Sequence, residues 1–266
     1  MKILVCVKQV PDTTEIRINP ETNTLIRDGV PSIVNTFDAY ALEMAARLKD
    51  EHGGEITVIS MGPEQAKAAL KECLAVGADK AVLVNDRAFG GSDTLATSYI
   101  LSRAIAHLEG ENGTYDLIFC GKQAIDGDTA QVGPEIAEHL GRPQATYLVE
   151  LVENQEEEIL VKRETDSGYE ILAAKKPAVL TVTKPAFAPR YPTVKSKLAA
   201  GRAEIPILTA ADLDLDLTRT GLKGSPTKVR RTFTPSHGKE SVAVRGETAQ
   251  EMAACLVEHL TSARIV

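Results

Sequence analysis

Residues 1–145 alternate short apolar, β-branched runs with segments whose apolar residues recur at helical spacing. Strands that alternate with helices in this way form parallel sheets joined by right-handed crossovers. The pattern therefore predicts an α/β fold with an open, mainly parallel sheet and helices on both faces. The predicted strands in this part of the chain are Ile3–Val7, Glu55–Ile59, Ala81–Val84 and Leu117–Cys120.

Helix signals follow these strands. A helix over residues 37–51 follows a cap at Asn35 or Thr36, and another begins at Pro63 and ends at Gly77. Each strand thus leads through a loop into a helix. Open parallel sheets bind ligands at the carboxyl ends of their strands, so these loops form the candidate site.

The pattern changes near residue 146. Strands separated by charged turns predict a small antiparallel layer over about 146–176, and an apolar strand over 177–182 returns to the main sheet. Several prolines and basic residues between about 184 and 204 indicate a docking loop, although a merely solvated loop fits equally well. We assign residues 1–204 to one nucleotide-binding α/β domain.

Residues 205–266 have weak periodicity and little capacity to form a core. A final helix over about 248–261 carries its apolar residues on one side. A stretch of this length without a core of its own requires a surface to lie on. We therefore interpret residues 205–266 as a C-terminal arm that contacts another subunit.

Composition and charge exclude several kinds of partner. The formal net charge is −7, so the chain lacks the basic surface of a nucleic-acid-binding protein. It contains no Trp and only 4% aromatic residues, so aromatic stacking cannot be the main mode of ligand binding. The sequence shows neither a signal-peptide pattern nor a membrane-spanning apolar stretch. We expect a cytoplasmic protein without membrane insertion.

Cysteines and histidines form no catalytic or metal-binding pattern. The four cysteines lie far apart, and three have the surroundings of buried small hydrophobic residues. The five histidines are scattered, and those near helix ends suit the helix dipole better than a metal. We therefore nominate neither a catalytic residue nor a metal site, and activity of the chain alone remains an open question.

The most informative loop is the run Gly121–Ile136, which follows a predicted strand and opens a helix. Its small residues allow close backbone approach, and Asp128 or Thr129 is the expected cap of a helix whose free amides hold an anion. Since Asp126 and Asp128 would repel a phosphate, we expect one of them to contact ribose or point away. A capped turn without a ligand remains the alternative.

A second loop, Arg87–Thr97, connects another strand to a helix. Gly90 and Gly91 would let a ligand approach the main chain, whereas a simple capped glycine turn explains the same residues. No Walker loop and no G-x-G-x-x-G follows any predicted strand, so the standard nucleotide-hydrolase and dehydrogenase frameworks are unsupported.

Short motifs that recur in order connect the chain to a known family. These motifs are Val5–Asp12, Arg27–Gly29, Met61–Pro63, Ala75–Asp79, Gly121–Asp126, Val161–Leu172 and Pro177–Thr181. With them, nearly the whole chain resembles the β subunit of electron-transfer flavoproteins. The resemblance implies an adenine-nucleotide α-hydrolase-like fold and an obligate partner, the α subunit of the same family.

The resemblance also implies a cofactor site. Carried over to this sequence, and with the second loop included, the expected binding residues are Cys6, Asn35, Thr36, Phe37, Asp38, Met61, Gly90, Gly91, Asp93, Thr94, Thr97, Gln123, Ala124, Ile125, Asp126, Gly127, Asp128, Thr129, Ala130, Gln131, Val132, Gly133 and Pro134. They lie mainly on the loops chosen above from strand order.

Two subtypes of the family differ in what the β subunit holds. Respiratory members resemble holders of structural AMP, whereas electron-bifurcating members hold FAD in this subunit and a second FAD in the α subunit. The runs Phe89–Thr97 and Asp126–Glu135 are similar to bifurcating members. A glycine pair in the first run would open space for a flavin ring and for NADH.

The bifurcating subtype implies a set of electron partners. NADH would supply hydride, ferredoxin or flavodoxin would take one electron, and a flavin dehydrogenase of the acyl-CoA or lactate type would exchange the other through the α-subunit FAD. Val194 replaces a leucine that anchors the respiratory type to a dehydrogenase, so dehydrogenase docking stays possible. A free-standing nucleotide module like the universal stress proteins is the alternative of another class.

Overall fold

The computed structural model describes residues 1–12, 18–19, 24–25, 31–230 and 241–266. The chain divides into two compact units, Met1–Arg230 and Arg231–Val266, which are described separately. The motif at residues 27–29 and part of the predicted arm, residues 231–240, lie outside the described residues.

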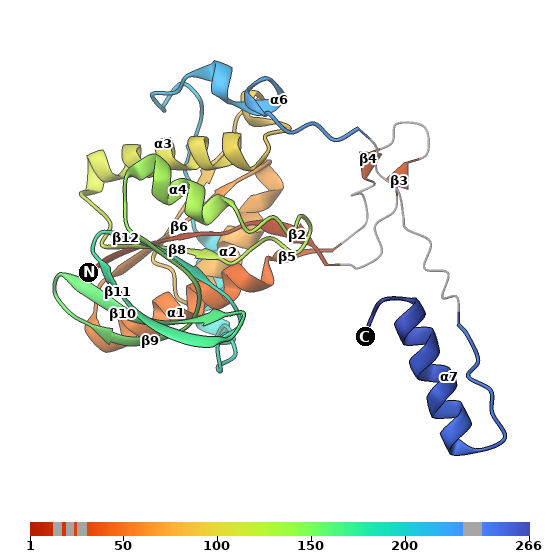
Figure 1. Cartoon of the computed structure of the whole chain (residues 1–266). Coiled ribbons are helices and arrows are strands. Elements are labelled where there is room, and N and C mark those ends of the chain that lie inside the picture. Colours follow the sequence, from red (N-terminus) through yellow and green to blue (C-terminus); the bar gives the residue numbers. More distant parts are fainter. Residues whose placement is uncertain (13–17, 20–23, 26–30, 231–240) are drawn as a thin grey trace. The chain divides into compact units, whose positions relative to one another are not determined.

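The first unit is built on a nine-stranded sheet with the order β11-β10-β9-β12-β8-β1-β6-β7-β13 (Figure 1). Every strand pair from β9 to β13 in this order is parallel, which confirms the predicted open, mainly parallel sheet. The strands of the parallel part that follow β9 in the order are β12 (Ala178–Val182), β8 (Leu117–Gly121), β1 (Lys2–Cys6), β6 (Glu55–Met61), β7 (Lys80–Val84) and β13 (Ile207–Leu208).

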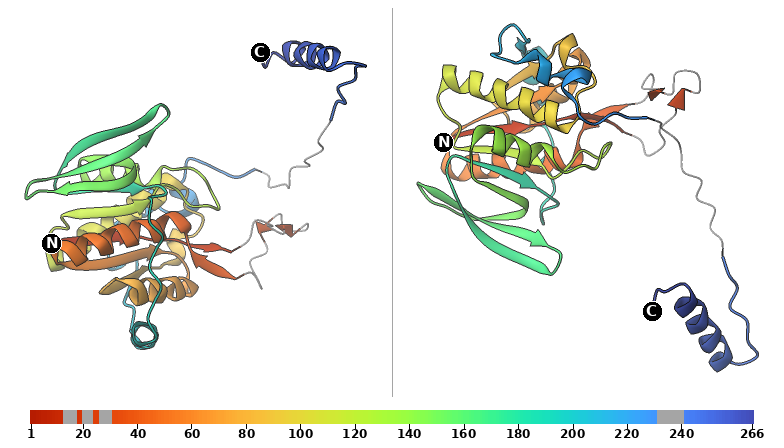
Figure 2. Two further views of the ribbon diagram at one scale, coloured as in Figure 1. Left: turned by 90° about the horizontal axis from the view of Figure 1, so that it is seen from below. Right: turned by 45° about the horizontal axis from the view of Figure 1, so that its top comes forward.

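The predicted antiparallel strands extend this sheet at one end (Figure 2). They are β9 (Gln144–Asn154), β10 (Glu158–Thr165) and β11 (Gly168–Lys175). The start of β9 pairs with β12 in parallel and its remainder pairs with β10 in antiparallel fashion. Tyr147, with φ of 60°, lies where β9 changes partners. The antiparallel strands are therefore continuous with the main sheet through β9.

Helices cover both faces of the sheet, as the alternation of apolar residues predicted. Ile3 and Val5 belong to a core shared with α1 (Thr36–His52) and α2 (Lys67–Val76). Their neighbours Leu4 and Cys6 belong to a second core shared with α3 (Thr94–Asn112) and α4 (Val132–Leu140). Successive side chains of a strand point to opposite faces, so β1 contributes to both cores.

Short elements complete the described chain. They are β2 (Gln9–Pro11) paired with β5 (Ser32–Val34), β3 (Ile18–Asn19) paired with β4 (Thr24–Leu25), the 3₁₀ turns η1 (Glu64–Ala66), η2 (Arg87–Phe89) and η3 (Leu217–Arg219), and the helices α5 (Val194–Arg202), α6 (Gly221–Gly224) and α7 (Ala249–Ser262). The predicted helix start at Pro63 is the cap of η1, and the regular helix α2 begins only at Lys67.

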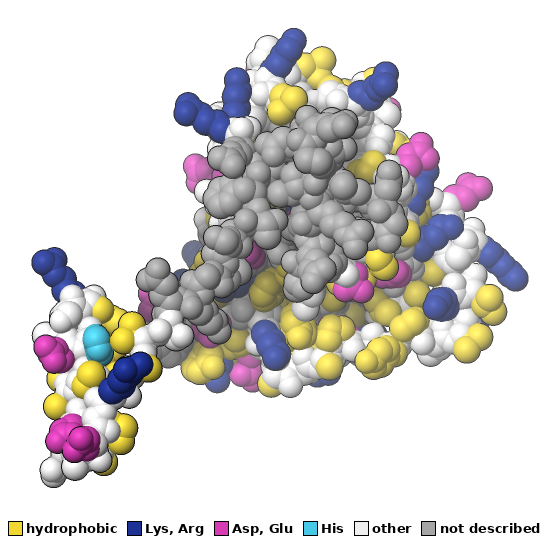
Figure 3. Space-filling view, turned by 90° about the vertical axis from the view of Figure 1, so that its right-hand side faces the viewer, with side chains coloured by type: hydrophobic (Ala, Val, Ile, Leu, Met, Phe, Trp, Pro, Cys, Tyr) yellow, Lys and Arg dark blue, Asp and Glu magenta, His cyan; other side chains and the backbone are white. Residues whose placement is uncertain are grey.

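Residues 205–230 pack with the first unit. β13 adds a strand to β7, and the division between the two units follows Arg230. In the second unit, α7 begins with a capping box between Thr248 and Glu251 and leaves apolar side chains exposed (Figure 3). No helix in the described part of the chain is both long and apolar enough to cross a membrane.

Gly121, the last residue of β8, brings α1 against the sheet. A Cβ added at this position would lie 2.3 Å from Asp38 Oδ1 and 2.7 Å from the carbonyl carbon of Phe37. Both neighbours belong to the first turn of α1, so a side chain at residue 121 would push the helix away. The absence of a side chain therefore fixes how closely α1 approaches β8.

We expect Gly121→Ala to lower the free energy of unfolding by about 1–3 kcal/mol, because it overpacks this contact. Gly127→Ala is the matched control, since nothing lies within 4 Å of a Cβ added there. Urea denaturation followed by circular dichroism measures both variants. Equal stability of the two would contradict the steric explanation.

Candidate functional site

The strand order reverses direction at β1. The chain runs from β1 through α1 to β6 and then β7 on one side, whereas β8 lies on the other side of β1. In open α/β sheets the crevice at the carboxyl ends of such neighbouring strands is the usual ligand site. A cavity of about 360 Å³ opens there, which lies within the usual range of about 300–1,000 Å³ for small-molecule sites.

The cavity gathers about half of the residues that the sequence nominated. The predicted residues in its wall are Cys6, Asp38, Met61, Asp93, Thr94, Thr97, Ala124, Gly127, Thr129, Val132 and Gly133. The others lie in the same loops but outside the wall, namely Asn35, Thr36, Phe37, Gly90, Gly91, Gln123, Ile125, Asp126, Asp128, Ala130, Gln131 and Pro134. The sequence did not nominate Val7, Lys8, Ser92, Leu101, Cys120, Gly121 and Lys122, which complete it.

Asp38 joins three elements beneath the cavity. Its carboxylate accepts hydrogen bonds from the backbone N–H of Lys8 at 2.7 Å and of Gly121 at 3.1 Å. Lys8 follows β1, and Gly121 is the last residue of β8. Asp38 itself lies in the first turn of α1. The side chain therefore fixes the two strand ends relative to one another. Burial raises the pKa of Asp38 to about 7, although these N–H donors and the Lys8 charge oppose the shift.

Asn35 holds the loop after β8. It is the N-cap residue of α1, which confirms the predicted position of the cap, but its side chain makes no capping hydrogen bond. Its buried amide instead donates to the carbonyl of Gln123 at 2.8 Å and accepts from the N–H of Ile125 at 3.0 Å. These two bonds satisfy the backbone of the loop and leave its next residues free to face the cavity.

Along residues 126–129 of this loop, residues that line the cavity alternate with residues that do not. Gly127 and Thr129 line the cavity, whereas Asp126 pairs with Lys8 at 2.6 Å and Asp128 accepts from Gln123 at 2.6 Å. Neither aspartate belongs to the cavity wall. The predicted repulsion between these carboxylates and a phosphate is therefore avoided, as expected for residues that point away.

The start of α4 is suited to an anion. The helix begins at Val132, and its cap, Gln131, makes no side-chain capping bond, so the prediction of a cap at Asp128 or Thr129 is wrong. Asp128 and Ala130 have φ values of 52° and 53°, an uncommon left-handed conformation that is often found at functional sites. Backbone N–H groups at a helix start, free of capping side chains, are natural partners of phosphate.

The glycine pair of the second loop has a different role from the one predicted. Gly90 and Gly91 do not line the cavity, and a Cβ added at Gly91 would lie 2.6 Å from the side chain of Leu222. Gly91 has φ of 75°, which favours glycine. The pair thus admits a segment of the same chain, residues 216–227, which we call the strap.

The strap fixes the cavity residues that follow Gly91. Ser225 Oγ accepts from the N–H of Asp93 at 2.9 Å, and the N–H of Thr227 donates to Asp93 Oδ2 at 2.9 Å. The other oxygen of Asp93 accepts from Ala96 and caps α3. Burial raises the pKa of Asp93, but the hydrogen bonds from Thr227 and Ala96 outweigh it and leave the pKa below its usual value.

Cysteine thiols form part of the cavity floor. Cys6 and Cys120 are aligned partners on β1 and β8, and both are buried, as is Cys73, which confirms their predicted role as small hydrophobic residues. The neighbouring Cys6 thiol and burial raise the pKa of Cys120 well above its usual value. Such a thiol is unreactive. Within the described residues no three His, Cys, Asp or Glu side chains gather as a metal site would require.

These features fit an adenine nucleotide or an FAD. The start of α4 offers N–H groups without a capping side chain, and Gly127 leaves open space beside the cavity. The floor and the first turns of α3 supply apolar and hydroxyl groups for the remaining atoms. A group with phosphate at one end and a ring system at the other matches this distribution.

The pKa of Asp38 predicts a pH-dependent stability. The folded protein binds this proton more tightly than the unfolded chain does, so the contribution is complete below about pH 4 and lost as the pH rises to about 7. We expect the stability of the wild type relative to Asp38→Asn to fall by on the order of 4 kcal/mol over this window. Urea denaturation at several pH values measures it, and a constant difference would contradict it.

Comparison with known proteins gives the family. The model of the Electron transfer flavoprotein domain matches residues 22–213. Electron transfer flavoprotein subunits beta from Thermoanaerobacterium thermosaccharolyticum and Clostridium acetobutylicum are each 52% identical, with 100% and 98% of both chains covered. The CarD subunit of the caffeyl-CoA reductase–Etf complex of Acetobacterium woodii is 45% identical, again with 100% of both chains covered.

The relatives from Thermoanaerobacterium thermosaccharolyticum and Acetobacterium woodii match over the whole chain, so the similarity includes both units. They do not favour the alternative of a universal-stress-protein-like module. An electron transfer flavoprotein β subunit implies an α subunit as its partner. The cavity beside β1 and the nucleotide-compatible loop agree with what the sequence identities show. The chain belongs to the electron transfer flavoprotein family as a β subunit.

Proposed function

We propose that this chain, joined to an electron transfer flavoprotein α subunit, binds FAD in the cavity at the ends of β1 and β8 and serves electron bifurcation. The observation that carries the proposal is the extent of the cavity, which runs from the loop after β8 to Thr97 and Leu101 of α3. The wall therefore exceeds the phosphate-binding part. When bound, FAD would supply hydride acceptance from NADH and release of single electrons, one to ferredoxin or flavodoxin and one through the α-subunit FAD.

The residues of this chain hold and shield the cofactor. The free N–H groups at the start of α4 would bind phosphate, and Asp38 keeps the two strand ends in register. Its raised pKa reduces the negative charge that faces an anionic ligand near neutral pH. The Asp93 carboxylate is occupied by the strap and by α3, so it positions backbone and carries no proton to a substrate.

AMP in place of FAD is the second candidate, and one observation favours it. Gly91 packs against Leu222 of the strap, so the glycine pair does not widen the cavity for a flavin ring. A β subunit that holds AMP would have a scaffolding role, and the flavin chemistry would then lie in the α subunit.

The two candidates differ in cofactor content. We expect the co-purified heterodimer to contain two FAD and to lose flavin absorbance on addition of NADH. Acid extraction with chromatographic quantification measures FAD and AMP per heterodimer. One FAD together with one AMP would refute the bifurcating proposal and leave the family assignment intact.

A dehydrogenase partner is part of the same proposal. The name of the relative CarD places it in a complex with a caffeyl-CoA reductase, which supports an acyl-CoA type of partner over a lactate type. The predicted docking loop, residues 184–204, leaves Tyr191, Val194 and Leu198 exposed at 92%, 80% and 59%. Its helix, α5, begins with a capping box between Thr193 and Ser196.

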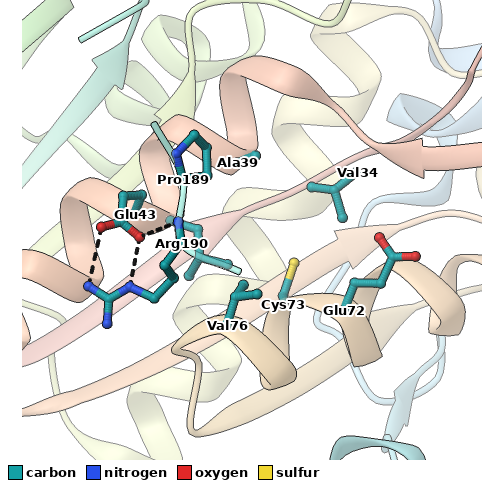
Figure 4. A pocket seen from close by; sticks show the side chains of 9 residues that line it. Val34, Ala39, Glu43, Glu72, Cys73, Val76, Pro189 and Arg190 are labelled. Atoms are coloured by element: carbon teal, nitrogen blue, oxygen red, sulfur yellow. Dashed lines mark hydrogen bonds and ion pairs between the residues drawn. The ribbon is translucent and has the colours of Figure 1, made fainter. Parts of the chain in front are cut away.

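The start of this loop is anchored in the first unit. The carboxylate of Glu43, a buried residue of α1, accepts from Arg190 N at 3.1 Å and from Arg190 Nε at 2.7 Å (Figure 4). Arg47 donates to the same carboxylate at 2.8 Å. Burial raises the pKa of Glu43, but these donors outweigh it and leave the pKa below its usual value. A small cavity lined by Val34, Cys73 and Pro189 lies beside the pair.

We expect Glu43→Gln to loosen the docking loop, because removal of one charge leaves the Arg190 guanidinium partly unpaired. Hydrogen exchange at residues 190–194 should rise, and the apparent affinity for the dehydrogenase should fall at unchanged cofactor content. Asp50→Asn is the matched control: Asp50 also accepts from Arg190, but it is 62% exposed, and exposed pairs contribute only about 0–1 kcal/mol. Identical exchange in the two variants would contradict the anchor.

A further inference from the structure

The charged side chains of the cavity wall are few and have different surroundings. Among the described residues they are Lys8, Asp38, Asp93 and Lys122. Asp93 is held by the strap, and Asp38 is held by the strand ends. On a chain with a net charge of −7, the two lysines are therefore the groups in the wall that can neutralise an anionic ligand.

Lys8 has a fixed backbone and an adjustable side chain. Its N–H donates to Asp38 at 2.7 Å, and its carbonyl accepts from the N–H of Asn35 at 2.9 Å. Its ammonium reaches across to the loop after β8 and contacts both oxygens of Asp126, at 2.6 and 2.8 Å. The side chain is 49% exposed, so the ammonium can exchange partners without disturbing the core.

Lys122 is differently placed. Its ammonium lies 5.0 Å from the centre of the Tyr147 ring, a cation–π contact at the point where β9 changes partners. No carboxylate within the described residues pairs with it at salt-bridge distance. Lys122 belongs to the loop that leads to the uncapped start of α4, whereas Lys8 follows β1 and reaches that loop through its ion pair with Asp126. Of the two lysines, Lys8 is the one whose ammonium has a carboxylate partner that a phosphate oxygen can replace.

We propose that the Lys8 ammonium binds the phosphate of the bound nucleotide. Without a nucleotide the Asp126 carboxylate is the counter-ion of this ammonium, and a phosphate oxygen replaces that carboxylate when the nucleotide binds. Asp126 lies outside the cavity wall, so it releases the ammonium without itself facing the phosphate. Each added phosphate charge then strengthens binding through Lys8, whereas the nucleoside part is bound by other groups. The inference deepens the proposed function and depends on nucleotide binding in this cavity.

The test compares adenosine, AMP and ADP on the α/β heterodimer after its bound nucleotide has been extracted with a chaotropic salt and the protein has been returned to buffer. Isothermal titration gives the ratio of the adenosine Kd to the ADP Kd for the wild type, Lys8→Met and Asp126→Asn. Lys2→Met is the matched control, since Lys2 opens the same strand and its ammonium donates to the carbonyl of Asn112 at the opposite edge of the sheet.

We expect Lys8→Met to weaken ADP binding at least about tenfold, the loss typical of a hydrogen bond to a charged group, and to change adenosine binding less than about twofold. Asp126→Asn should bind ADP as tightly as the wild type or more tightly, because the competing carboxylate is gone. Lys2→Met should keep the wild-type ratio.

Three outcomes would overturn the inference. If Lys8→Met and Asp126→Asn weaken all three ligands alike, the ion pair only holds the loop. If Lys8→Met keeps the wild-type ratio of the adenosine Kd to the ADP Kd, Lys8 does not bind the phosphate, although the proposed function survives. Failure of the wild type to bind AMP or ADP would remove the proposed function and this inference together.

Discussion

The buried carboxylate of Asp38 is the interaction on which the site depends. Two parallel strands that are not consecutive in sequence must end at the same height for a crevice to form between them. Asp38 accepts an N–H from the end of each strand and belongs to the helix packed beneath them. The missing side chain of Gly121 gives that helix room to approach. Fold and site thus share one contact.

The same arrangement keeps the acidic side chains of the loop out of the proposed anion site. Asp126 and Asp128 belong to the loop that faces the cavity, but neither is part of its wall: Asp126 pairs with Lys8 of the wall, and Asp128 accepts a hydrogen bond from Gln123, which lies outside it. The small residues that follow each aspartate, Gly127 and Thr129, are the ones that line the cavity. In the proposed site, backbone N–H groups at the start of α4 and the two lysines of the wall, Lys8 and Lys122, supply the positive potential.

Periodicity was sufficient to predict the sheet and the loops at its carboxyl edge, because strand alternation and helix spacing are local properties. Contacts between distant residues were not predictable in this way. The role of Asn35 depends on residues 123 and 125, and the role of Gly91 depends on Leu222. Lys8 was missed because the family resemblance gave no role to a lysine after β1, although its place directly after Cys6 and Val7 was an available signal.

The last strand of the sheet has a practical meaning for chimeric proteins. β13 covers the outer edge of β7, and the strap that follows it seals the loop containing Gly91 and Asp93. Both belong to the folded body even though they come late in the chain, so an exchange of C-terminal segments between relatives should be joined after Arg230. A joint near residue 204 would instead pair β13 and the strap of one relative with the β7 edge and the Gly91 loop of another, so these contacts would have to form between two different sequences.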